Sequence, residues 1–458
     1  MRPFDLAVRN GLVVNASSRF HGDIGIREGR IDQLGGSIQA EQSIDAAGKL
    51  VLPGGIDMHV HLSPVQLPEE TIRWVDDFQS GSAAAAAGGI TTIGNITFPL
   101  PGETISAALQ RTETEEAHNS LIDYVLHPVL LQPDCLNELP QLSDSGQRSI
   151  KIFMMLSSFD SATTEYLRIV EAAGKLEMVS MVHCEDASLI GFLCKRLLAE
   201  GRGSAAHYAE SRPSYVETVA VQRAAAMAQA TGAPLYIVHL SSARALAACR
   251  QARGEGARLW VEIRPIYLYL TRERFEEVDA AKYVGNPPLR EPTDVEALWN
   301  GLRNGDIQTV CTDHAPWLLA DKLEAGRDVS NFRPGISELE TLLPMLYHGM
   351  VVTRKMPVER FVELTAANAA RLFGLYPQKG TIAVGSDADL TIWDPEQKWR
   401  VRADAFHSRA DFTPYEGWEL VGKPIITISR GEVVCERGRI SAAWGRGRRL
   451  KMAAAGRL

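Results

Sequence analysis

The chain of 458 residues is 45% hydrophobic and carries a formal net charge of −8. It is long enough to build one large and one small hydrophobic core. The acidic balance gives no basic surface for nucleic acid, and no stretch approaches the ~18 uncharged apolar residues that cross a membrane. The six cysteines show no paired spacing, and the amino terminus shows no charged and then apolar leader. We therefore expect reduced thiols in a cytoplasmic protein without a nucleic-acid or membrane partner.

Both ends of the chain have a different pattern of apolar and turn residues from its middle. Residues 1–54 read as short alternating strands separated by turns at Asn10-Gly11, Glu28-Gly29 and Ala47-Gly48, and residues 378–443 read the same way. We predict that these two segments together form one small β-sandwich.

The middle of the chain, residues 55–377, alternates apolar runs with stretches of helical character. Helices are expected between the runs, among others over 79–88, 163–174, 214–230 and 293–303. Eight strands alternating with helices predict an α/β fold, a TIM-like (β/α)8 barrel, whose chemistry lies at the carboxyl ends of the strands. The eight runs that read as buried parallel strands are 51–61, 90–96, 123–130, 149–156, 178–183, 235–239, 258–263 and 307–313.

Side chains that bind metals stand at several of these carboxyl ends. The first run closes on His59 and His61, which are two residues apart and therefore face the same side of a strand. Three later runs end in His183, His239 and Asp313. A single histidine at a strand end is more often a core or surface residue than a ligand. Four imidazoles and a carboxylate at one barrel face, however, are the usual ligands of zinc or manganese and predict a metal centre.

A lysine lies inside another of the apolar runs. Lys151 stands between Ile150 and Ile152, where an ammonium would have to give up its water at a large cost in free energy. A buried amine loses its proton readily, and a neutral amine can add carbon dioxide to become a carbamate, an anionic oxygen ligand suited to bridging two cations. The alternative is a strand-end lysine whose amine reaches water. The histidines and Asp313 favour the metal interpretation.

The last residues, 444–458, form a basic tail. They include Arg446, Arg448, Arg449 and Lys451 and show no apolar period. We expect a frayed, solvated tail, with a contact to another subunit as the alternative.

The motifs stand in an order that resembles one enzyme family. His-x-His is followed by the strand lysine, by two strand-end histidines and by Thr312-Asp313-His314-Ala315-Pro316, and further matching segments are 282–290, 335–341 and 380–390. This pattern covers nearly the whole chain and is similar to the cyclic amidohydrolases of the amidohydrolase superfamily: hydantoinases, dihydropyrimidinases, allantoinases and dihydroorotases. The resemblance is specific for the family and much less specific for the substrate.

The resemblance implies a hydrolase that opens a cyclic amide with two divalent metal ions, expected to be zinc, with manganese as the alternative. Carbamylated Lys151 would bridge the ions, and a hydroxide between them would attack the ring carbonyl. Asp313 would take the proton of this hydroxide and pass it to the leaving nitrogen. The family also implies a homo-oligomer, a tetramer or a dimer. The other ligands would be His59 and His61, with Asp313, for one ion and His183 and His239 for the second.

Asp57 precedes the first ligand by two residues. It is expected to support a ligand histidine from behind, and a plain structural hydrogen bond is the equal alternative.

Several departures from the family pattern restrict the substrate. Dihydroorotases follow His-x-His with Leu-Arg, where the arginine binds the substrate carboxylate, but here Ser63 follows Leu62. Hydantoinases and dihydropyrimidinases usually carry a tyrosine five residues after the lysine, where this chain has Leu156, and their ring-binding asparagine falls on Pro334. Backbone groups around Asn286 can still bind the ring imide. We expect a cyclic ureide or imide with an unusual substituent, and allantoin is the second candidate ahead of dihydroorotate.

Two other classes of protein share the fold. Some dihydropyrimidinase-like proteins are non-catalytic assembly scaffolds, but those characteristically lose metal ligands, and this chain keeps all six. Mononuclear deaminases of the same superfamily would have no need for Lys151. Metal analysis distinguishes both alternatives from the binuclear hydrolase.

Overall fold

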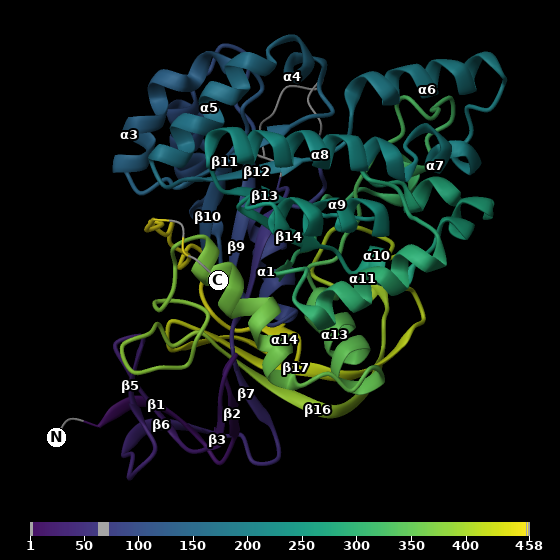
Figure 1. Cartoon of the computed structure of the whole chain (residues 1–458). Coiled ribbons are helices and arrows are strands. Elements are labelled where there is room, and N and C mark those ends of the chain that lie inside the picture. The colour runs from purple at the N-terminus through teal and green to yellow at the C-terminus, as the bar shows by residue number, and fades with distance from the viewer. Residues whose placement is uncertain (1–2, 63–72, 455, 457–458) are drawn as a thin grey trace.

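The computed structural model describes residues 3–62, 73–454 and 456. Within these residues, eight parallel strands stand at the centre (Figure 1), in the hydrogen-bonded orders β10-β9-β8 and β11-β12-β13-β14-β15. Backbone bridges between Val129 and Lys151 and between Val60 and His314 join the two groups. The predicted (β/α)8 barrel is confirmed. Its strands are β8 (Gly55–Val60), β9 (Ile90–Thr97), β10 (Asp123–Pro128), β11 (Ser149–Phe153), β12 (Val179–His183), β13 (Leu235–Ile237), β14 (Leu259–Ile263) and β15 (Thr309–Val310).

Helices surround the barrel on its outer side (Figure 1). The longer ones are α1 (Phe78–Ala87), α5 (Thr163–Lys175), α6 (Ala187–Ala199), α8 (Ser214–Thr231), α9 (Ala243–Gly254) and α11 (Pro292–Asn304). The shorter ones are α2 (Ile105–Arg111), α3 (Leu139–Asp144), α4 (Ser157–Ser161), α7 (Tyr208–Ser211), α10 (Ile266–Tyr269), α12 (Leu319–Lys322), α13 (Leu342–Leu346), α14 (Val358–Val362) and α15 (Asn368–Leu372). The four helices predicted by range correspond to α1, α5, α8 and α11. In the described part of the chain, no helix is long and apolar enough to cross a membrane.

The ends of these elements follow local signals in the sequence. Helix α1 begins after Asp77, whose carboxylate accepts the N–H of Ser80 at 2.9 Å. Helix α8 ends at Gly232, whose φ of +69° is the left-handed conformation that glycine adopts without strain. All eight residues of β9 are buried, because the barrel interior covers one face and helices cover the other. Burial on both faces explains why the strands read as nearly continuous apolar runs.

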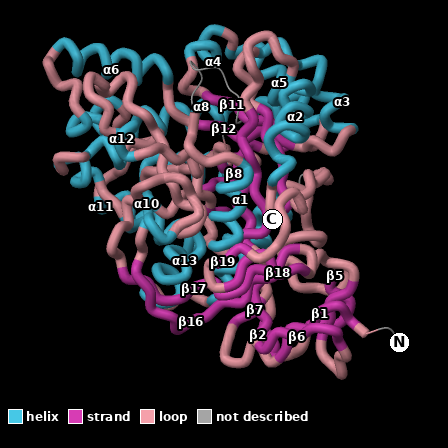
Figure 2. The backbone as a smooth tube through the Cα atoms, turned by 180° about the vertical axis from the view of Figure 1, so that it is seen from behind, coloured by secondary structure: helices cyan, strands magenta, loops and turns pink. Residues whose placement is uncertain are grey.

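Strands from both ends of the chain lie together beside the barrel, in the lower part of Figure 2. One sheet has the order β5-β4-β1-β6 and the other the order β19-β18-β17-β16-β7-β2-β3. Leu6 and Ile24 of the first sheet share a core with Val51 and Ile392 of the second, so the predicted β-sandwich is confirmed. Its strands are β1 (Phe4–Arg9), β2 (Leu12–Val14), β3 (Arg19–His21), β4 (Ile24–Arg27), β5 (Arg30–Leu34), β6 (Ala40–Asp45), β7 (Leu50–Pro53), β16 (Leu390–Arg400), β17 (Glu419–Ser429), β18 (Glu432–Glu436) and β19 (Arg439–Ile440).

The chain passes from sandwich to barrel within two residues. Strand β7 ends at Pro53 in the sandwich, and β8 begins at Gly55 in the barrel. We propose domain boundaries at 54/55 and 377/378, with the carboxyl-terminal segment from residue 444 as a separate unit of the chain.

The prediction of a frayed, solvated tail is wrong for the described residues from 444 onward. Leu450 and Met452 are only 8% and 4% exposed and lie in a core cluster with Phe373. The backbone N–H of Leu450 donates to the carbonyl of Tyr124 at 2.8 Å, at the amino-terminal end of β10. Arg449 also forms an ion pair with Glu113. This packing could not be predicted from the sequence, because two apolar side chains separated by one lysine are too short a pattern to indicate a buried segment.

Truncating either buried tail side chain is expected to destabilise the protein. Leu450→Ala and Met452→Ala should each cost about 2 to 5 kcal/mol in the free energy of unfolding, because each leaves a cavity in a packed core. Lys451→Ala is the matched control, since Lys451 is exposed between them, and it should change this free energy by less than about 0.5 kcal/mol. Urea unfolding measures all three. Equal midpoints for Leu450→Ala and Lys451→Ala would show that the tail does not stabilise the barrel.

Candidate metal centre

Three of the predicted ligands meet where the first and last barrel strands end. His59 lies in β8, His61 follows β8 by one residue, and Asp313 follows β15 by three. Asp313 Oδ1 lies 3.0 Å from His61 Nε2 and 3.3 Å from His59 Nε2. One ligand atom from each residue lies within 4.8 Å of the other two, so a single cation can reach all three.

The remaining two histidines form a second pair beside the first. His183 ends β12, and its Nδ1 lies 3.0 Å from Nε2 of His239, which follows β13 by two residues. The ring centroids of His239 and His59 are 5.4 Å apart. The two pairs therefore share one barrel mouth.

Lys151 lies beside His59 and is fully buried in β11. Its Nζ is 3.2 Å from His59 Nε2. Burial lowers the pKa of Lys151 to about 8, even though Asp313 and Glu262 favour the charged form. The alternative of an amine that reaches water is ruled out, because the side chain ends inside the ligand cluster.

The protonation of the histidines fits a bound cation. Burial lowers the pKa of all four ligand imidazoles, so each offers a neutral ring at pH 7. Within the described residues, Nδ1 of His61 and Nδ1 of His239 are buried without a hydrogen-bond partner. Both atoms lie on the ring side opposite the Nε2 atoms that face Asp313 and His183, so they do not mark the position of the cation. The donor set of imidazoles, one carboxylate and one amine that can become a carbamate therefore suits borderline divalent metals.

Two glutamates that we did not predict hold the ligand histidines from behind. Glu262 Oε1 lies 2.9 Å from His59 Nδ1, and Glu185 Oε2 lies 2.9 Å from His183 Nε2. Because a carboxylate only accepts, each facing imidazole nitrogen donates, which leaves the other ring nitrogen bare for a metal. Glu262 could have been predicted from the sequence, because it is a charged residue within a buried apolar strand, as Lys151 is.

Asp57 does not reach an imidazole. Its Oδ1 accepts the backbone N–H of His59 at 3.1 Å, and its Oδ2 accepts the hydroxyl of Thr312 at 2.6 Å. Of the two roles considered for Asp57, the geometry corresponds to the structural hydrogen bond, which ties the end of β8 to the segment that carries Asp313.

A second possible metal group consists of His59, Glu262 and Cys311. Burial raises the pKa of the Cys311 thiol well above its ordinary value, and the thiol rather than the thiolate is a poor ligand. Glu262 already accepts from His59, from Tyr236 and from the backbone of His239. We therefore assign the cation site to the opposite, Nε2 side of His59.

Two of the candidate ligands adopt a backbone conformation that is unusual outside glycine. His239 has φ +38° and Asp313 has φ +49°. Such residues cost of order 1–3 kcal/mol each and persist where the surrounding structure fixes them, typically at functional sites. The conformation occurs where both side chains leave the carboxyl ends of β13 and β15, and six further described non-glycine residues share it.

The residues expected to bind substrate lie outside the ligand cluster. Leu156 is half-buried and immediately precedes α4. Asn286 is half-buried and accepts the hydroxyl of Tyr208. Pro334 turns its carbonyl toward Trp317 Nε1 at 2.8 Å, and Ser63 lies outside the described residues. Among the described residues, no hydrogen bond joins Leu156 or Asn286 to the candidate ligands.

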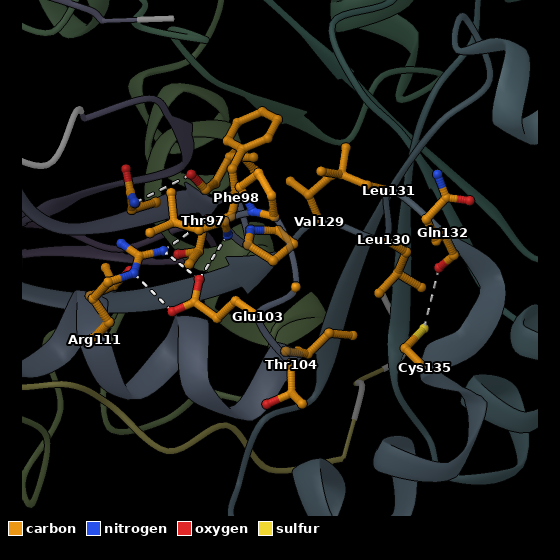
Figure 3. Close-up of a pocket in the computed structure, with 18 of the residues that line it drawn as sticks. Thr97, Phe98, Glu103, Thr104, Arg111, Val129, Leu130, Leu131, Gln132 and Cys135 are labelled. Atoms are coloured by element: carbon orange, nitrogen blue, oxygen red, sulfur yellow. Dashed lines mark hydrogen bonds and ion pairs between the residues drawn. The ribbon is translucent and has the colours of Figure 1, made fainter. Parts of the chain in front are cut away.

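A cavity of about 930 Å³ is lined by Leu62, Trp74 and Phe98 among other residues, and Figure 3 shows Phe98 on its wall. The Trp74 and Phe98 rings lie 4.8 and 6.0 Å from the His61 ring, which itself does not line the cavity. Its walls are mainly apolar, with Glu103 and Arg111 paired to each other on one side. The cavity therefore offers room for a large apolar group next to the metal ligands.

The sequence profile of the amidohydrolase family matches residues 50–434. The chain belongs to this family. It is 38% identical over 446 residues to a D-hydantoinase of Ralstonia pickettii, covering 95% of this chain and 96% of that protein.

Two solved structures carry the same fold over nearly their whole length. A dihydropyrimidinase from Brevibacillus agri superposes with a TM-score of 0.94 at 34% identity, covering 99% of both chains. An L-hydantoinase from Arthrobacter aurescens superposes with a TM-score of 0.88 at 32% identity, covering 97% of this chain and 99% of that one. The prediction of a metal-binding cyclic amidohydrolase of the hydantoinase and dihydropyrimidinase type is confirmed.

Proposed function

We propose that the protein hydrolyses the cyclic amide of a hydantoin-like or dihydropyrimidine-like ring that carries a large apolar substituent. The single observation that carries this proposal is the convergence of four neutral imidazoles, one buried amine and one carboxylate at the barrel mouth. The likeness to hydantoinases and a dihydropyrimidinase over the full length supports the ring class.

The proposed cofactor is a pair of divalent ions, zinc with manganese as the alternative. His59, His61 and Asp313 would hold one ion, His183 and His239 the other, and carbamylated Lys151 would connect them. When bound, the two cations would acidify a water molecule and polarise the scissile carbonyl.

The protein's own residues then account for the proton and for the ring. Asp313 takes a proton from the attacking water and delivers it to the ring nitrogen as the C–N bond breaks. The carbonyl carbon keeps the oxygen of water, so a hydantoin opens to an N-carbamoyl amino acid. Glu262 and Glu185 keep His59 and His183 in one tautomer throughout. Trp74 and Phe98, which line the cavity, would shield that side of a bound ring from water.

The substituent on the ring is expected to decide the rate. A tyrosine hydroxyl near a developing oxyanion contributes roughly 2.7–4 kcal/mol of transition-state stabilisation, and Leu156 cannot supply it. Unsubstituted hydantoin and dihydrouracil should therefore turn over weakly, and rings with an apolar substituent should turn over better. The measurement is kcat/KM across a ring series, including allantoin, for the wild type and Leu156→Tyr. If dihydrouracil is hydrolysed as fast as any other ring, Leu156 does not determine specificity.

Allantoin remains the second candidate substrate. A leucine at position 156 leaves one donor fewer for a polar ring, and the cavity wall beside His61 is mainly apolar; both features disfavour allantoin. The same series, run with racemic 5-substituted hydantoins and chiral product analysis, reports the enantiomer that is opened. The R. pickettii D-hydantoinase supports a preference for the D form.

We also propose a homo-oligomer, a tetramer or a dimer, on the strength of the family and of the common closed symmetries. Light scattering of the full chain at micromolar concentration should report a multiple of 50.2 kDa, and a monomer would contradict this. A cytoplasmic location is supported by the six cysteines, all of which are buried free thiols.

A further inference from the structure

Strand β14 supplies no predicted ligand. A charged side chain inside it and another directly after it nevertheless contact candidate metal ligands. Glu262 lies inside β14 and Arg264 follows its last residue, so the two side chains are two positions apart and point to the same face. Glu262 holds His59, and Arg264 Nη1 donates to Asp313 Oδ2 at 2.9 Å. The element that carries no predicted ligand therefore supports two of them from behind.

The two oxygens of Asp313 have different partners. Oδ1 faces His61 and His59, the ligands of the proposed first ion, while Oδ2 is held by Arg264. The ion pair with Arg264 on Oδ2 leaves Oδ1 directed at the two histidines.

Arg264 is itself held rigidly. It is only 1% exposed, and its Nε and Nη2 both donate to Glu338 Oε2, at 3.2 and 2.9 Å. Glu338 accepts the hydroxyl of Tyr415 with its other oxygen. The planar guanidinium thus spans two carboxylates from different segments, a geometry that an ammonium cannot reproduce.

We propose that Arg264 is the positioning residue of Asp313: it holds Oδ2 so that Oδ1 stays directed at His59 and His61. The inference rests on the proposed function only in taking Asp313 as a metal ligand. Loss of the guanidinium should therefore weaken binding of the first ion and lower kcat, while KM for the ring changes little.

The test compares Arg264→Ala and Arg264→Lys with wild type, using the full chain stripped of metal and titrated with zinc against a chromogenic chelator. Arg360→Ala is the control, because Arg360 binds the carbonyls of Leu302 and Ile307 at the opposite end of β15. We expect Arg264→Ala to bind zinc at least ~10-fold more weakly. The thermal midpoint of its metal-free form is expected to fall further than that of Arg360→Ala, because Asp313 and Glu338 lose a buried partner, so zinc affinity is measured at a temperature where both variants are folded.

Chemical rescue separates positioning from general support of the fold. Guanidinium at tens of millimolar (about 10–50 mM) should restore zinc affinity and kcat of Arg264→Ala in part, whereas ethylammonium, with the same charge but without the planar fork, should not. Arg264→Lys should remain as weak as Arg264→Ala without rescue. Equal rescue by both cations would overturn the proposal, because charge alone would then suffice.

Wild-type zinc affinity and kcat in Arg264→Ala would also overturn it. Zinc affinity is measured without substrate, so the result stands even if no ring of the series is hydrolysed. If Arg264→Ala does not fold, the double variant Arg264→Met with Glu338→Gln, which removes both partners of the buried pair, is measured in the same way. If neither variant folds, Arg264 is a structural residue and the proposal fails.

Discussion

Replacing Lys151 with alanine is expected to remove the bound metal and all measurable ring hydrolysis. The wild type should carry about two divalent ions per chain, because six ligands at one barrel mouth exceed what one four-coordinate ion needs. Without the lysine, His59 faces an empty position where Nζ now lies at 3.2 Å. Metal analysis of protein grown with ample zinc or manganese measures the loss. Short carboxylic acids should restore part of both properties by replacing the carbamate.

Lys322→Ala is the matched control for this loss. Among the described residues, Lys322 is a second buried lysine, at 1% exposure, whose amine donates to backbone carbonyls, those of Val284, Arg333 and Gly335. Its replacement should lower the thermal midpoint while metal content stays near two. A wild-type protein that binds almost no metal would contradict the proposal of a two-metal site.

Replacing Asp313 with asparagine is expected to cut kcat by at least ~10²-fold, the usual cost of losing general acid–base help. Burial disfavours a charged Asp313, but Arg264 and His59 outweigh it and hold its pKa below the ordinary value. The carboxylate is therefore ionised before the reaction and ready to accept a proton. Asparagine keeps an oxygen for the metal and cannot carry the proton, so metal content measured beside kcat separates the two roles.

Asp123→Asn is the control for this variant. Asp123 is also buried but begins β10, at the opposite end of the barrel, where it pairs with Lys379. It should lower stability and leave kcat unchanged. A near-normal kcat in Asp313→Asn would show that the proton is carried by another group.

The candidate ligand positions could be predicted from the sequence because each ends a run that is buried on both faces. His59, His61, His183, His239 and Asp313 interrupt apolar patterns, and parallel strands bring their carboxyl ends to one face. The fold followed from the same runs. A role for Lys151 could be predicted for a related reason, since an isolated charge in an apolar strand needs a partner.

The residues that support the candidate ligands were harder to predict from the sequence. Arg264 stands outside its strand beside Pro265 and gives no periodic signal, and its partner Glu338 lies 74 residues away in an irregular segment. The docked tail was hidden because its arginines dominate its composition. The direction of Asp57 also depends on the backbone of Thr312, a contact between segments 255 residues apart. Pairings across the chain between irregular segments leave no local pattern.

The β-sandwich has a consequence for the order in which the protein is made. Val51 of β7 pairs with Ile392 of β16, a partner some 340 residues later in the chain. At about 5 to 20 residues per second, the ribosome needs roughly 20 to 70 s to supply that partner. During this time one edge of β7 stays open, and an open strand edge pairs with whatever strand it meets. A chain released before residue 390 therefore keeps this edge exposed, so incomplete products should be prone to aggregate even when their barrels have formed.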